Sequence, residues 1–119
     1  MAGPTGIDVP LDEFEDMVGD AIDSVPDEFR NAMTNVVITV EELADGTPLY
    51  GLYQGVPLTK RYRGTWNANP DRIFIYRRTI CEHCRTVEEV RRQVHKTVVH
   101  EIAHHFGISD PRLQELGWA

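Results

Sequence analysis

The 119-residue sequence contains no long hydrophobic run. We therefore expect no membrane partner, because a helix that crosses a bilayer needs about 20 predominantly apolar residues in succession. No basic stretch is followed by an apolar one near the N-terminus, so we expect no secretory signal and a cytoplasmic location. Basic residues are also few, with 12 Lys and Arg against 19 Asp and Glu. The net charge of −7 argues against an extended nucleic-acid surface.

Cysteine is scarce as well, and its two copies, Cys81 and Cys84, frame the short pattern Cys-Glu-His-Cys. We favour a reduced pair with a local structural role, as is usual in the cytoplasm. A second metal site completed by His83 or His95 is an alternative. A redox motif is a third, although no thioredoxin-like βαβ pattern surrounds the pair. With no further cysteines, a four-thiolate site is excluded.

The length suits a single domain, and the composition, 41% hydrophobic and 26% charged, is typical of a globular protein. We predict a flexible N-terminal arm over residues 1–10, which are rich in glycine and proline, and one domain over residues 11–119. The oligomeric state is open.

Apolar periodicity and turn residues predict an α+β fold, a small sheet of about three strands with helices packed on one face. The Gly51 and Gly55 pair interrupts one apolar segment, which indicates a close approach of its backbone to a neighbour. Thr86 and Glu89 form the pattern of a capping box at the start of a long helix. The elements expected are helices at 11–25, 27–33, 86–106 and 111–117, strands at 36–41 and 72–77, a strand or shaped loop at 49–55 and a loop at 61–70.

The most informative feature is the motif His-Glu-x-x-His-x-x-Gly-x-x-Asp over residues 100–110. On a helix, His100 and His104 lie one turn apart on the same face, so both imidazoles can reach one ion. Glu101 is turned about 100° from His100, where it is better placed to hold a water molecule than to be a ligand. The residues around Glu101 are apolar, so we expect this carboxylate to be buried and to need a partner. A catalytic zinc site has three protein ligands and one open position.

Asp110 is the predicted third ligand, because Gly107 can end the helix with a positive φ and turn the chain back. The alternative is that Asp110 caps the last helix, with Pro111 at its first position. Glu115 is a less suitable acid, and His105 points away from the face that carries His100 and His104.

The sequence resembles the minimal zincin-like metallopeptidases, a family of small bacterial proteins. The resemblance rests on His-Glu-Ile-Ala-His-His-Phe-Gly-Ile-Ser-Asp at 100–110, on residues 113–118 and on residues 50–59, and it runs from about Asp12 to Trp118. It implies a compact zincin fold with a short sheet over the active-site helix, zinc held by His100, His104 and Asp110, and Glu101 as general base. The motif is similar to that of metzincins as far as Gly107. Asp110 stands where most metzincins have a third His, and no Met follows Met33.

We therefore predict a zinc-dependent metallopeptidase that cleaves a peptide or protein segment with a metal-activated water. Tyr53, Tyr76 and His105 are candidates to stabilise the oxyanion. The strand over 73–76 could bind an extended peptide at a sheet edge, unless it is central in the sheet. Two alternatives stay open. One is another zinc amide or ester hydrolase. The other is a non-catalytic domain that zinc stabilises and whose acidic N-terminal helix binds a partner.

Overall fold

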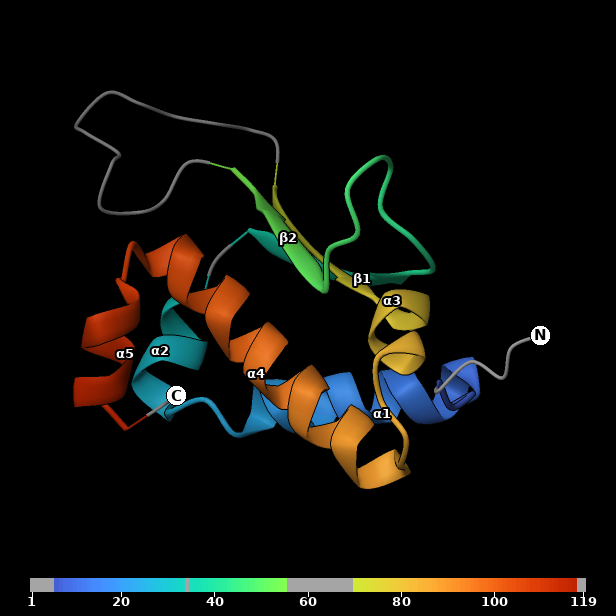
Figure 1. Cartoon of the computed structure of the whole chain (residues 1–119). Coiled ribbons are helices and arrows are strands. Elements are labelled where there is room, and N and C mark those ends of the chain that lie inside the picture. Colours follow the sequence, from blue (N-terminus) through green and yellow to red (C-terminus); the bar gives the residue numbers. More distant parts are fainter. Residues whose placement is uncertain (1–5, 34, 56–69, 118–119) are drawn as a thin grey trace.

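The structure is a computed structural model that describes residues 6–33, 35–55 and 70–117 (Figure 1). It has the predicted α+β class, with a three-stranded mixed sheet and five helices in the described residues. The elements are α1 (Leu11–Asp23), α2 (Asp27–Ala32), β1 (Val36–Glu41), β2 (Gly51–Gln54), β3 (Asp71–Tyr76), α3 (Arg77–Glu82), α4 (Val87–Phe106) and α5 (Asp110–Glu115). Apart from Pro70, the loop predicted over 61–70 lies outside these residues.

The sheet has the order β1-β3-β2, with β1 parallel and β2 antiparallel to β3. Its central strand is β3, whose Ile73 and Ile75 are fully buried. This position explains the continuous apolar run of that segment, since a central strand covered by other elements exposes little of its length. It also makes one hypothesis wrong: with neighbours on both sides, the strand over 73–76 has no free edge to which a peptide could add.

Helix α4 organises the fold, because it packs against β2 and β3 on one side and against α1 on another (Figure 1). Val90, Val94 and Val98 form its core-facing stripe and are fully buried. The helix begins as predicted with a capping box, in which Thr86 Oγ1 accepts from the Glu89 amide and the Glu89 carboxylate accepts from the Thr86 amide. The helix that carries the motif is therefore fixed at its start and along its length.

Helix α3 was not expected, because the strand was predicted to continue to Arg77, whereas β3 ends at Tyr76 and a helix begins at once. A six-residue helix is too short to show a helical period in the sequence. Tertiary contacts hold it instead. The Arg77 guanidinium donates to the Glu42 carboxylate at 2.6 and 2.8 Å and to the Val9 carbonyl at 2.6 Å, and Ile80 is fully buried.

Both cysteines are buried as free thiols, Cys81 on α3 and Cys84 just after it. Burial raises the pKa of each thiol, which keeps them protonated and disfavours both thiolate ligation and redox reactivity. Within residues 6–33, 35–55 and 70–117, no metal-binding cluster includes either cysteine. Burial as protonated thiols favours a structural role for the two cysteines.

The predicted flexible arm needs a correction over the part that the structure describes. The Ile7 amide donates to the Cys81 carbonyl at 3.0 Å, and Val9 is 1% exposed in the core. Residues 6–10 are thus held against α3 and the core. Glycine and proline in this segment indicated a lack of regular structure, and they gave no sign of these long-range contacts.

Candidate metal centre

The motif occupies the last two turns of α4 and the turn that follows. His100, Glu101 and His104 lie inside the helix, which ends at Phe106. Gly107 has φ 72°, the left-handed conformation that favours glycine at a helix C-terminus. The Ile108 amide then donates to the Ala103 carbonyl at 2.9 Å, which directs the chain back toward the helix. The turn predicted from Gly107 is confirmed.

His100, Glu101 and His104 form one compact cluster. Each offers one ligand atom, and these atoms all lie within 4.8 Å of one another. The two imidazole centroids are 4.5 Å apart, and His104 Nδ1 lies 3.1 Å from Glu101 Oε1. The His100 and His104 side chains are 40% and 45% exposed, whereas that of Glu101 is 9% exposed. The predicted burial of this carboxylate beside an imidazole is confirmed, and the two histidines stay open to solvent.

Strand β2 packs directly over Glu101 because it begins with a glycine. A Cβ at Gly51 would lie 2.6 Å from Thr97 Cγ2, closer than real Cβ atoms approach, and 3.2 Å from Glu101 Cγ, which is an unusually tight contact. At the other end of the segment, a Cβ at Gly55 would lie 2.5 Å from Asp71 Cγ. The close backbone approach predicted from these two glycines is therefore present at both positions. At Gly51 the close approach lets β2 pack against α4, where the strand covers the Glu101 carboxylate.

Asp110 lies at the edge of the cluster. Its Oδ1 is 3.4 Å from His100 Nδ1, and its side chain is 70% exposed. It is not part of the group whose ligand atoms lie within 4.8 Å of one another. Nor does it cap α5, since Ser109 is the N-cap and its side chain accepts from the Arg112 amide. The capping alternative is therefore wrong, and the Asp110 carboxylate faces His100 from the first position of α5.

The next residue along α4 after His104, His105, belongs to a separate network. Its Nδ1 lies 2.9 Å from Asp71 Oδ2, and the Tyr53 hydroxyl donates to the same oxygen at 2.6 Å. His105 and Asp71 are 0% and 2% exposed. Since a carboxylate only accepts, the imidazole proton lies on Nδ1. These contacts tie the end of β2 and the start of β3 to α4, directly behind the cluster.

The surroundings of the three residues predicted to stabilise the oxyanion bear on that role. His105 is buried away from solvent, and the Tyr53 hydroxyl is committed to Asp71. Tyr76 is buried and stacks on Phe74 at a centroid distance of 6.4 Å. Burial, with a smaller contribution from nearby carboxylates, raises the pKa of Tyr76, so its phenol stays protonated. Of the three, His105 and Tyr53 already serve the network, and neither offers a spare donor to a substrate.

Asp71 was not predicted from the sequence as the partner of His105. A signal was present, because His105 continues the buried stripe of valines along α4 and a buried imidazole needs a hydrogen-bond partner. The partner itself, 34 positions earlier, was beyond the reach of local patterns.

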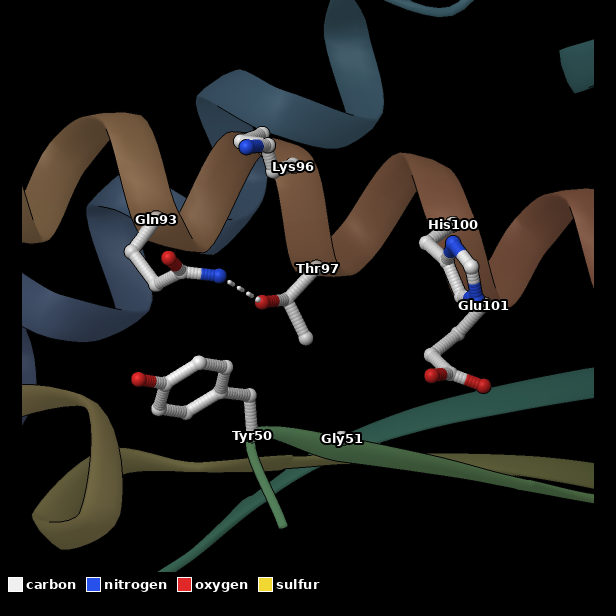
Figure 2. Close-up of a pocket in the computed structure, with 7 residues that line it drawn as sticks. All are labelled: Tyr50, Gly51, Gln93, Lys96, Thr97, His100 and Glu101. Carbon is white, nitrogen blue, oxygen red and sulfur yellow. Dashed lines mark hydrogen bonds between the residues drawn. The ribbon is translucent and has the colours of Figure 1, made fainter. Parts of the chain in front are cut away.

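A pocket of about 290 Å³ adjoins the cluster toward the N-terminus of α4 (Figure 2). Helix α4 forms one wall and the start of β2 forms the other, with Gly51 below Glu101. The Gln93 amide donates to Thr97 Oγ1 at 3.0 Å on the helix side. Its lining residues are Tyr50, Gly51, Gln93, Lys96, Thr97, His100 and Glu101.

The donor set of the cluster fits a divalent transition metal. Two imidazoles and a carboxylate within a few ångströms are ligands typical of zinc, and mixed nitrogen and oxygen ligation also suits related metals. His100 and His104 are partly exposed, so an ion can reach their ring nitrogens.

In the described residues, no helix is both long enough and apolar enough to cross a membrane.

Comparisons with known proteins bear on the fold and on the family. The chain is similar in fold to a conserved hypothetical protein from Thermo thermophilus, with a TM-score of 0.56 and 18% identity over 91% of this chain and 97% of the other. No curated protein matches the sequence. A family model described as zincin-like metallopeptidase matches residues 31–118, which include the whole motif. This family implies a metal ion, typically zinc. The chain belongs to the zincin-like metallopeptidase family.

Proposed function

We propose that this protein is a zinc-dependent metallopeptidase that hydrolyses a peptide bond in a peptide or an exposed protein segment. The observation that carries the proposal is the convergence of His100, Glu101 and His104 on one side of α4, where the two imidazoles are open to solvent beside a pocket. A purely structural metal site is closed by four protein ligands, whereas a catalytic one keeps a position open.

His100 and His104 would hold the metal through ring nitrogens, with Asp110 as the third ligand. Support for Asp110 comes from its position: its carboxylate faces His100 at 3.4 Å, and Ser109 rather than Asp110 caps α5. This contact places the negative charge of the Asp110 carboxylate beside His100, on the side of the cluster that is exposed to solvent. A ligand set of two histidines and one aspartate leaves a coordination position for water or substrate.

Glu101 is the proposed general base. When bound, a zinc ion polarises the scissile carbonyl and lowers the pKa of a nearby water toward about 7. The Glu101 carboxylate takes a proton from that water, whose oxygen adds to the carbonyl carbon. As the C–N bond breaks, Glu101 passes the proton to the leaving amine. The packing of Gly51 over Glu101 and the contact with His104 hold the carboxylate in one place for both transfers.

The decisive experiment compares the zinc-loaded wild type with Glu101→Gln, using a peptide mixture as substrate and mass spectrometry as readout. We expect Glu101→Gln to keep its zinc and to lose about 100- to 10,000-fold in cleavage rate, the usual contribution of a general base. Glu88→Gln is the matched control, since Glu88 lies in the exposed first turn of the same helix and should leave the rate unchanged.

Removal of the metal by a chelator should abolish cleavage, and added zinc should restore it. A Glu101→Gln protein that holds zinc and cleaves as fast as the wild type would refute the base assignment. Cleavage of small amides or esters without any cleavage of peptides would point to another zinc hydrolase. Zinc held by four protein ligands, with no turnover of any substrate, would identify a metal-stabilised binding domain instead.

A further inference from the structure

The pocket beside the cluster has a chemistry of its own. Gln93, Thr97, His100 and Glu101 follow one another along one side of α4, so the pocket and the candidate metal centre form a continuous surface (Figure 2). Its volume of about 290 Å³ lies at the low end of ligand pockets, which span roughly 300–1,000 Å³. A space of this size suits one side chain of a longer substrate better than an entire small molecule.

The lining away from Glu101 is rich in hydrogen-bond donors. Lys96 contributes an ammonium group with three donors and no acceptor, and Tyr50 and Thr97 contribute hydroxyl groups. Gln93 uses one amide hydrogen on Thr97 and has a second to offer. Lys96 is exposed and has no ion pair within residues 6–33, 35–55 and 70–117. Arg91, on the same helix, is in contrast paired with Asp20 and Glu88.

We propose that this pocket receives an acidic side chain, Asp or Glu, of the peptide substrate, with Lys96 as the specificity-determining residue. This assignment rests on the peptidase function proposed above. A carboxylate carries two acceptor oxygens and a negative charge, so it complements the Lys96 ammonium group and the hydroxyl groups that line the same pocket. The Glu101 carboxylate lies at the opposite end of the pocket, next to β2, and so repels an acidic side chain less than it would at the Lys96 end (Figure 2). Because the pocket shares His100 and Glu101 with the cluster, the acidic residue lies next to the scissile bond.

The first test profiles the cleavage sites of the zinc-loaded wild type in a peptide library by mass spectrometry. We expect Asp and Glu to be enriched at one position close to the cleaved bond. Lys96→Glu should lower that enrichment by about five- to tenfold and favour Lys or Arg there, since reversal turns one attraction into a repulsion. Arg92→Glu is the control: Arg92 lies on the same helix outside this pocket and carries the same change in net charge.

The second test measures binding without cleavage, which separates this inference from the peptidase proposal. Two fluorescein-labelled hexapeptide pools, identical except for Glu or Gln at one fixed position, are titrated against zinc-loaded Glu101→Gln protein by fluorescence anisotropy. We expect the Glu pool to bind about five- to tenfold more tightly, and Lys96→Glu in the same background to remove the difference.

The outcomes then distinguish the two proposals. If no peptide is cleaved but the Glu pool still binds more tightly through Lys96, the peptidase proposal fails and the acidic specificity of the pocket stands. Cleavage without a preference for acidic residues, or equal effects of Lys96→Glu and Arg92→Glu, overturns the assignment of Lys96. Equal binding of the two pools also overturns it.

Discussion

His104 and His105 are neighbours on α4, and each has a carboxylate oxygen about 3 Å from its Nδ1 atom, yet the two imidazoles differ in exposure and in the element that carries their partner. His104 is 45% exposed, and its partner Glu101 lies one turn away on the same helix. His105 is fully buried, and its partner Asp71 comes from β3, on another element. Glu101 of the first pair lines a pocket, while the second pair binds the sheet to the helix.

This difference follows from the helix period. A step of one residue turns a side chain by about 100°, so His104 and His105 leave the helix in different directions. One face of α4 meets solvent and can bind a metal or a substrate, and the other meets the core, where a charged or polar group must be paired. The same chemical pair, an imidazole and a carboxylate, therefore belongs to the candidate metal centre in one place and to the packed core in the other. Mutations at the two pairs should therefore have different effects on stability and on metal binding.

The largest effect on stability is expected from the buried pair. Asp71→Ala leaves His105 and the Tyr53 hydroxyl without their shared acceptor, and we expect the free energy of unfolding to fall by about 3–5 kcal/mol. Glu101→Gln, in the pair with His104, should change it by less than about 1 kcal/mol, because the amide keeps the shape and remains hydrogen-bonded. Urea denaturation of the metal-free proteins, followed by circular dichroism, measures both. Equal losses would contradict a structural role confined to the buried pair.

The pair of His104 and Glu101 should instead control metal binding. His104→Ala removes a proposed ligand, and we expect zinc affinity to fall by at least about 100-fold, since even changes behind the ligands cost about 10- to 100-fold. The stability of the metal-free protein should hardly change. Competition with a zinc-binding dye measures the affinity. A mutated protein that retains wild-type zinc affinity would show that His104 is not a ligand.

Two glycines test the packing that separates the pairs. Gly51→Ala places a methyl group 2.6 Å from Thr97 Cγ2, so β2 or the helix must shift, and we expect a loss of about 1–3 kcal/mol together with slower cleavage. Gly19→Ala is the matched change, because it lies in α1 and meets nothing within 4 Å. It should stabilise the protein by about 0.5–1 kcal/mol. Thermal unfolding of both proteins gives the sign, and a stabilising Gly51→Ala would refute the close approach.

The smallest effect concerns the helix that carries both histidines. Thr86→Ala removes the side-chain half of the capping box, and we expect it to lower the free energy of unfolding by about 1 kcal/mol. Because the cap lies at the far end of α4 from the motif, zinc affinity should stay unchanged. Denaturant unfolding and a zinc titration on the same protein check both statements, and a drop in zinc affinity would show that fraying of the helix reaches the site.

Local patterns in the sequence predicted most of the elements. The strand over 36–41 has the expected bounds, and the capping box and Gly107 marked both ends of α4. The motif predicted the cluster of His100, Glu101 and His104, because residues within one turn of a helix are close whatever the rest of the chain does. The sequence did not reveal α3, which is too short to show a period and depends on contacts of Arg77 with distant residues.

By itself, then, the sequence determined which helix carries the two imidazoles and the acid, and that a glycine turn follows them, since both depend on neighbours along the chain. Only the tertiary structure decided that Asp71 pairs with His105, that β2 encloses Glu101, and that Lys96 lines a pocket beside the cluster. These arrangements join residues from separate elements. Their positions depend on how the sheet packs on α4, and local periodicity in the sequence does not predict that packing.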